Sequence, residues 1–194
     1  MIRLWHKMKA LSSLLLLTAS LAAAHATIYQ FDFLGGVMSG SQEVPPNASP
    51  GIGYEDAGGV GGNAFVYDDV ADTLSMGQLS YSGLLGLSTA AHIHRSPAGV
   101  NGPVNFPLTL VPAGVTAGMV LPAAFVLSTG QEADLFGGNL YLNIHSTAFP
   151  GGEIRGQLVL AEEVTQGVPE ASTYGAIGVV GALALASWRR RQAR

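Results

Sequence analysis

The central part of this 194-residue sequence predicts an all-β domain built as a Greek-key β-sandwich. Between residues 28 and 161, short segments alternate apolar and polar side chains with a period of two, the pattern of half-buried strands. Gly, Pro, Asn and Asp recur between these segments, as expected of turns. No long stretch of this region has the 3.6-residue periodicity of an amphipathic helix.

The predicted strands follow one another with short connections. The first covers residues 28–34 and leads into a long loop over 35–62, which is rich in Gly and Pro. A hairpin over 63–84 is expected next, with its turn in an Asp-rich segment. Further strands are expected at 89–94, 103–110, 139–146 and 153–160, with a mixed stretch at 111–127 and a polar turn at 128–134.

Both ends of the chain predict targeting to a membrane. Residues 1–26 combine a basic start, an apolar run and Ala24-His25-Ala26, the features of a secretory signal peptide cleaved after Ala26. A polar linker over 162–170 precedes the uncharged segment 171–188. As a helix that segment would be about 27 Å long, enough to cross a bilayer core. The basic residues of 189–194 would then form a cytoplasmic tail, and the domain would cover 27–161.

The charge of the predicted domain argues against nucleic acid as a partner. Between residues 27 and 168, twelve acidic residues stand against Arg95 and Arg155, a net charge of −10. Nucleic acid binding needs clustered positive charge to neutralise phosphates, whereas this domain should attract cations. The chain contains no cysteine, which excludes disulfides and thiolate ligands.

Three histidines form a candidate metal site. His92 and His94 are two residues apart in a predicted strand, so both point to one face about 6.6 Å apart. His145 lies in the 139–146 strand and is the only other histidine outside the predicted signal peptide. Imidazole suits copper and zinc, and water or a carboxylate would fill the remaining positions. The alternative is that these histidines only pack and hydrogen-bond, with Arg155 paired to Glu153 or another acid.

Two other polar segments allow a functional interpretation. The aspartates in the 68–72 segment are either a calcium site or ordinary turn residues, and they lack EF-hand spacing. Asn47-Ala48-Ser49 matches an N-glycosylation triplet. The sequence has no Gly-x-Ser-x-Gly elbow, so serine hydrolase chemistry is not expected, and no catalytic residue is assigned.

The body of the sequence resembles the CHRD domain, a module named from chordin and also found in exported bacterial proteins. The resemblance covers about residues 31–160 and rests on the segments 40–46, 89–94, 101–104, 143–146 and 150–158. It implies an exported binding or matrix-associated protein, with exopolysaccharide or surface proteins as the partners to expect.

The C-terminal end resembles the PEP-CTERM sorting signal of Gram-negative bacteria. Val168-Pro169-Glu170 matches the start of the usual box, although Ala171 stands where a second proline is usual. The apolar segment and Arg189-Arg190-Arg191 complete the pattern. The resemblance implies processing by an exosortase-type enzyme and a location on the outer side of the cell envelope, at the cell surface or secreted. A plain C-terminal membrane anchor is the alternative.

The histidine pattern is similar to that of copper/zinc superoxide dismutases, which, like immunoglobulin domains, are β-sandwiches. The similarity implies His92, His94 and His145 as copper ligands and Arg155 as a second-shell or anion-guiding residue. However, no histidine occurs between Arg95 and Asn139, so a zinc subsite is missing. We therefore expect an envelope-anchored binding protein that holds copper or zinc, with a small copper-dependent oxidoreductase as the alternative.

Overall fold

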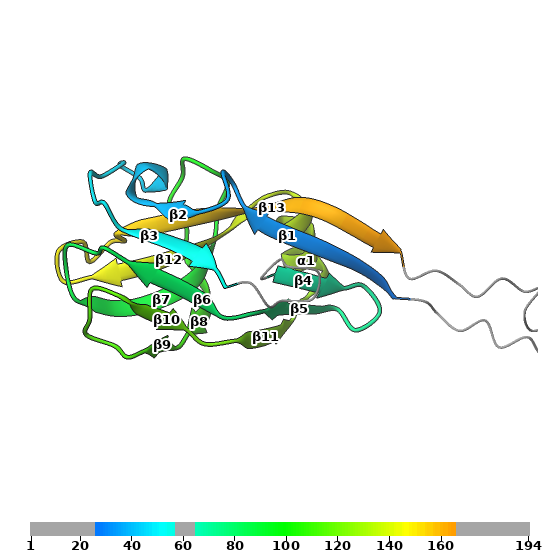
Figure 1. Ribbon diagram of the computed structural model, residues 1–194. Coiled ribbons are helices and arrows are strands. Elements are labelled where there is room, and N and C mark those ends of the chain that lie inside the picture. Colours follow the sequence, from blue (N-terminus) through cyan, green and yellow to red (C-terminus); the bar gives the residue numbers. More distant parts are fainter. Residues whose placement is uncertain (1–25, 57–64, 166–194) are drawn as a thin grey trace, which may run out of the picture.

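The structure is a computed structural model that describes residues 26–56 and 65–165. These residues form a sheet of thirteen strands and one short α-helix (Figure 1). The all-β prediction is confirmed, whereas the Greek-key arrangement stays a prediction. Apart from Ala26, the predicted signal peptide lies outside the described residues. So do the Gly-rich stretch 57–64, the Val168-Pro169-Glu170 box, the transmembrane helix and the basic tail.

The strands are short except for the last one. The first half of the domain contains β1 (Thr27–Phe33), β2 (Met38–Ser39), the 3-10 turn η1 (Gly40–Gln42), β3 (Ile52–Glu55), β4 (Phe65–Asp68), β5 (Thr73–Met76) and β6 (Leu79–Ser82). The second half contains β7 (Ser88–Arg95), β8 (Val104–Leu108), β9 (Leu110–Val111), β10 (Gly118–Val120), β11 (Ala123–Val126), α1 (Thr129–Phe136), β12 (Leu140–Ser146) and β13 (Ile154–Thr165).

The long strand β13 joins the parts of the sheet. Its C-terminal half pairs with β1, which continues through β4 and β5 to β11. Its N-terminal half pairs with β12, which continues to β7 and β8, and it also pairs with β2, which leads to β3, β6, β10 and β9. In Figure 1, β13 and β1 lie side by side along one edge of the domain. β13 runs past the predicted domain end at residue 161, and Thr165 pairs with Thr27.

The core lies between these parts of the sheet. The predicted alternation in the first strand is confirmed for Phe31 and Phe33, which are 0% and 1% exposed. Helix α1 places Phe136 edge-on against the rings of Tyr29 and Phe31, with centroids 4.8 and 5.5 Å away. The core is therefore built from the apolar positions of the predicted strands and from one helix.

The predicted loop over 35–62 contains two strands, β2 and β3, that the sequence did not indicate. In β3 the buried position is Gly53, and Gly51 lies just before the strand on the same face, so no apolar alternation is visible there. A Cβ on Gly53 would lie 2.9 Å from Sδ of Met38, and one on Gly51 would lie 3.0 Å from the side chain of Leu84. A larger side chain at either position would collide with these neighbours, and the two glycines hide the strand pattern.

The predicted polar turn at 128–134 is also wrong, because the segment begins helix α1. The Gln131 side-chain oxygen accepts hydrogen bonds from the backbone N–H of Ser128 at 2.9 Å and from its hydroxyl at 2.8 Å. This Ser-x-x-Gln pair is a capping box that starts a helix without a long apolar repeat. Within the two described ranges, no helix has the length and apolar character needed to span a membrane.

A matched pair of substitutions on β13 tests the position of the core. Leu158 is 0% exposed and Leu160 is 48% exposed. Leu158→Ala should lower the free energy of unfolding by about 2–5 kcal/mol because it leaves a cavity. Leu160→Ala should change it by about 0.5 kcal/mol or less. Urea denaturation followed by circular dichroism measures both, and equal effects would contradict the observed burial.

Candidate metal centre

The outer face of the sheet formed by β7, β12 and β13 is polar. On β12, Leu140, Leu142 and Ile144 point into the core, so the residues between them point outward, as the sequence predicts. The register places His94 beside Tyr141 and His92 beside Asn143. It also places Tyr141 beside Gln157, and Asn143 beside Arg155. This polar face brings together His92, His94, His145 and Arg155, the residues that the sequence singled out.

The His94 ring is fixed by a hydrogen bond and by a stacking contact. Its Nδ1 donates to the carbonyl oxygen of Gly102 at 3.0 Å, and its ring stacks on Tyr141 with centroids 5.0 Å apart and planes 10° apart. The side chain is 7% exposed, and its buried Nε2 has no hydrogen-bond partner. Because Nδ1 carries the proton, Nε2 presents a lone pair to the neighbouring histidines.

His145 and His92 are in direct contact. Nδ1 of His145 donates to the carbonyl oxygen of Pro150 at 2.9 Å, which leaves its Nε2 as an acceptor. That Nε2 lies 3.1 Å from Nδ1 of His92. A bound ion would replace this hydrogen bond between the two imidazoles.

The three histidines are close enough to share one ion. One ligand nitrogen from each can be chosen so that all three lie within 4.8 Å of one another. Burial is the main cause that lowers the pKa of each imidazole, and the hydrogen bonds of His94 and His145 to backbone carbonyls oppose it. Lowered pKa values keep the rings neutral at pH 7, as metal ligation requires.

Two irregularities in the sheet lie next to these histidines. The pairing of β7 with β12 shifts between His145 and Ser146, and the pairing of β7 with β8 shifts between Ile93 and His94. Bulges of this kind change the direction of nearby side chains and are common beside functional sites. They help to turn histidines from two strands toward one point.

Arg155 holds the loop that contains Pro97 and Val100 against the sheet. It is 1% exposed, and its guanidinium donates to the carbonyl oxygens of Val100 at 3.0 Å and Pro97 at 3.1 Å and to the side chain of Gln157 at 2.8 Å. Its Cζ also lies 3.4 Å from the centroid of the Tyr141 ring. The register of β12 between β7 and β13 places Arg155 and His94 on opposite sides of this ring. An anion-guiding role for Arg155 stays a prediction.

The alternative pairing of Arg155 with Glu153 does not occur. The Glu153 carboxylate accepts hydrogen bonds from the hydroxyl of Ser49 at 2.5 Å and from the backbone N–H groups of Leu85 and Gly86 at 2.5 and 3.3 Å. Burial raises the pKa of Glu153, but these donors together with Ser146 lower it more, so the group is ionised. The Glu153 carboxylate therefore links the loop at Ser49 to the segment at Leu85 and Gly86.

Sequence reasoning missed Asn143, which pairs with His92, and Glu43, which Asn143 contacts. Both are buried, at 4% and 2% exposed, and the Asn143 amide donates to Oε2 of Glu43 at 3.3 Å. Oε1 of Glu43 and Oδ1 of Asn143 have no hydrogen-bond partner. Burial raises the pKa of Glu43 to about 7, against the lowering effects of Arg155, Asn143 and the Val44 N–H. The Gln42-Glu43-Val44-Pro45-Pro46 motif was the only available signal, because burial of its carboxyl depends on the folded loops.

Loops enclose this polar face. The Asn101 amide donates to the carbonyl oxygen of Val44 at 2.7 Å, and the Asn47 amide donates to that of Glu153 at 3.0 Å. A cavity of about 460 Å³ lies between these loops and is lined by Glu43, Pro46, Asn101, Phe149, Pro150 and others. The loops that orient His94 and His145 therefore also border a space that a solute can enter.

The aspartates of the β4–β5 turn accept hydrogen bonds from nearby backbone N–H groups. Asp68 accepts from the backbone N–H groups of Val70 and Ala71, both at 2.9 Å, and Asp69 accepts from that of Thr27 at 2.7 Å. In residues 26–56 and 65–165, the histidine trio is the only group of three or more His, Asp or Glu side chains close enough to hold a metal. The turn interpretation of these aspartates is supported, and the calcium interpretation is not.

The fold and site define an all-β domain in which loops cover a polar face of the sheet. The family model of the CHRD domain matches residues 34–158, so the chain belongs to the CHRD domain family. No match was found among the curated proteins or among the solved structures.

The buried carboxyl of Glu43 predicts a pH-dependent stability. Its pKa is about 7 in the folded chain and near 4.5 when solvated, so wild-type stability falls as pH rises between these values. Glu43→Gln has no such proton to lose. Its free energy of unfolding relative to wild type should rise by roughly 3 kcal/mol or less between pH 4.5 and pH 8. Urea denaturation in EDTA at both pH values measures this, and the same difference at both would refute the burial effect.

Proposed function

We propose that this chain is an exported CHRD-domain binding protein, anchored at the outer side of the cell envelope, that holds a copper or zinc ion at His92, His94 and His145. The family supports a binding domain outside the cytoplasm. The histidine cluster supports the metal, because neutral imidazole nitrogens are suitable ligands for both ions.

The observation that carries the metal proposal is the orientation of His94 and His145. Each directs its Nδ1 proton to a backbone carbonyl, so that its Nε2 lone pair is available to the histidine cluster; Nε2 of His145 accepts from His92, and Nε2 of His94 has no partner. Metal-binding histidines commonly use the second ring nitrogen in this way, which fixes the tautomer and the ring plane. A histidine that served only packing would not need an unpartnered buried Nε2.

A binding role accounts for the site better than the oxidoreductase alternative. Arg155, which would guide an anion in such an enzyme, is buried and commits its guanidinium to Pro97, Val100 and Gln157. The described residues also bring no fourth histidine to the cluster. The proposed ion therefore serves binding or stability. Exopolysaccharide or a surface protein is the partner that we expect on the cell surface.

The terminal sequences support the proposed location. The signal-peptide pattern of residues 1–26 would export the domain, and the Val168-Pro169-Glu170 box with its apolar segment would tether it. An exosortase-type enzyme would then process the C-terminal end.

Metal binding is tested by titrating the full chain in mild detergent with Zn²⁺ and, under reducing conditions, with Cu⁺. Wild type should take up one ion per chain. His94→Gln should weaken binding by roughly 100-fold or more, because it removes one of three ligands. His25→Gln is the matched control, since His25 lies in the predicted signal peptide, and it should leave affinity unchanged. Lack of stoichiometric uptake by wild type would disprove the proposal.

Export is tested in a Gram-negative host by fractionation and N-terminal sequencing. The chain should appear in the envelope or surface fraction and begin at Thr27. Ala26→Phe should block cleavage because the signal peptidase accepts small residues at this position. A cytoplasmic chain that retains Met1 would contradict the assigned location.

A further inference from the structure

We propose that the histidine site selects a monovalent cation, Cu⁺, over divalent ions. This inference rests on the proposed metal function and names the ion that the same site favours. It is carried by the neutrality of the ligands, the burial of His94, and a fixed positive charge behind His94.

The ligand set contributes no negative charge. All three candidate ligands are imidazoles, and no carboxylate of the described residues joins the cluster. Bound Cu⁺ would leave a net charge of +1 at the site, whereas Zn²⁺ or Cu²⁺ would leave +2. The sequence has no cysteine whose thiolate could offset the difference.

Burial penalises the higher charge. His94 is 7% exposed, and its Nε2 is buried. The cost of moving an ion from water into a poorly polarisable interior rises with the square of its charge, so it is about four times larger for a divalent ion. In a neutral, partly desolvated site this cost works against the divalent ion, and no carboxylate ligand offsets it.

A guanidinium adds to this penalty. Arg155 lies against one face of Tyr141, with Cζ 3.4 Å from the ring centroid, and His94 stacks on the same ring with centroids 5.0 Å apart. Three hydrogen bonds hold Arg155 in place, so its charge cannot swing away from the site. Repulsion from Arg155 is among the causes that lower the pKa of His94.

The compensating anions are few or distant. Glu43 is the acidic neighbour of Arg155, and burial raises its pKa to about 7, so it is only partly ionised at neutral pH. Glu153 is ionised, but Ser49 and two backbone N–H groups bind its oxygens. No carboxylate is among the groups that shift the pKa values of the three histidines.

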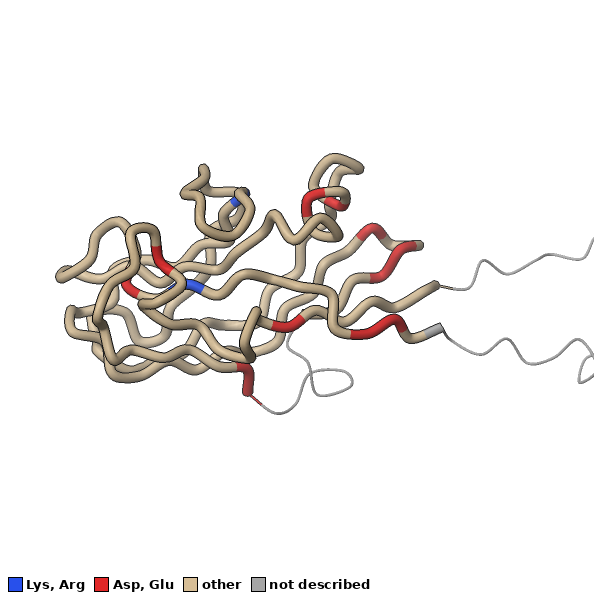
Figure 2. Tube along the Cα trace, turned by 90° about the horizontal axis from the view of Figure 1, so that it is seen from above, with Lys and Arg blue, Asp and Glu red and all other residues tan. Residues whose placement is uncertain are grey.

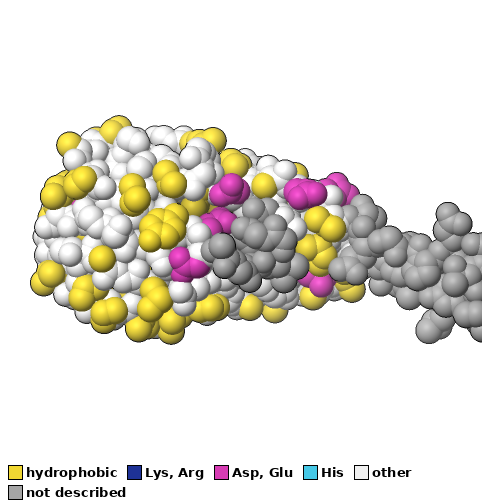
Figure 3. Space-filling view, viewed as in Figure 1, with side chains coloured by type: hydrophobic (Ala, Val, Ile, Leu, Met, Phe, Trp, Pro, Cys, Tyr) yellow, Lys and Arg dark blue, Asp and Glu magenta, His cyan; other side chains and the backbone are white. Residues whose placement is uncertain are grey.

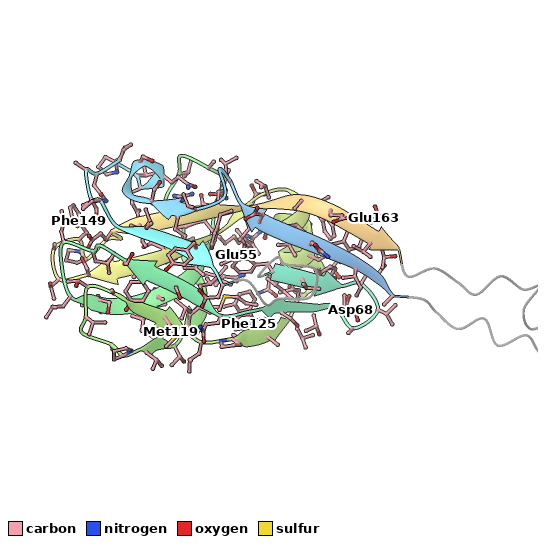
Figure 4. All side chains as sticks on the ribbon, in the orientation of Figure 1. Glu55, Asp68, Met119, Phe125, Phe149 and Glu163 are labelled. Atoms are coloured by element: carbon pink, nitrogen blue, oxygen red, sulfur yellow. The ribbon has the colours of Figure 1, made fainter. Side chains whose placement is uncertain are left out.

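Most of the acidic charge lies toward the other end of the domain. Figure 4 places Asp68 and Glu163 near the end where β1 and β13 meet the chain tails, and places Phe149, of the loop that orients His145, at the opposite end. Figure 2 shows most acidic residues in the half of the trace that carries the open ends of β1 and β13. Figure 3 shows acidic side chains over the middle of the domain and toward that end, and none at the opposite end of its visible face. Salt screens charges over such distances, so the net charge does not favour a divalent ion locally.

Cu⁺ and Zn²⁺ provide the test, because both have a filled d¹⁰ shell and differ by one unit of charge. Their dissociation constants for the full chain in mild detergent are measured by chelator competition, anaerobically for Cu⁺. Wild type should bind Cu⁺ at least about 100-fold more tightly than Zn²⁺. Comparable affinities for the two ions would overturn the selectivity.

Two variants of Arg155 isolate its charge. Arg155→Lys and Arg155→Met both lose the planar hydrogen-bonding fork, but only the second loses the positive charge. Relative to Arg155→Lys, Arg155→Met should improve Zn²⁺ affinity by about tenfold and Cu⁺ affinity by about threefold, because the repulsion scales with ion charge. Equal changes for both ions would refute the electrostatic cause.

A third variant covers the case in which the Arg155 variants do not fold, as judged by circular dichroism. Glu43→Gln removes the partly ionised carboxyl and should weaken Zn²⁺ binding more than Cu⁺ binding at pH 8. An equal effect on both ions would count against the inference. If wild type binds neither ion, the metal function itself fails, which is a different result from binding both ions without selectivity.

Discussion

The buried guanidinium of Arg155 is the interaction on which the polar face depends. It holds the carbonyl oxygens of Pro97 and Val100 above the sheet, and so it fixes the loop whose next residues include Gly102. Gly102 then accepts from Nδ1 of His94 and donates its N–H to the Tyr141 hydroxyl at 3.1 Å. Removal of the arginine would take away the donors that hold this loop and would release the group that orients His94.

The alternating side chains of β12 contribute to both the core and the histidine cluster. Its apolar positions fill the core, and the positions between them support the histidine cluster, so a register slip of one residue would destroy both. The pairing of His92 with Asn143 and of His94 with Tyr141 is therefore protected by the packing of Leu142 on the reverse side.

The sequence predicted the features that depend on local pattern. Alternation identified β1, β7 and β12, and the spacing of His92 and His94 identified their shared face. It did not reveal β3, whose buried position is Gly53, or α1, which depends on a cap and not on a long repeat. Glu43 could not be placed beside Asn143, because a hundred residues separate them and only the folded loops bury the carboxyl. Proximity of His145 to the His-x-His pair was a hypothesis until the register of β7 and β12 showed it.

The length of β13 also has a mechanical consequence. Its C-terminal half is bonded to β1, and its N-terminal half is bonded to β12 on one edge and to β2 on the other. A pulling force that enters the domain at Thr165 acts along this strand, and the hydrogen bonds of its C-terminal half to β1 bear the load first. The first residues to give way would be those paired with β1, while Arg155 and Gln157, at the opposite end of the strand, would be the last to move. A tether at the C-terminal side would thus transmit load into the fold while it spares the histidines.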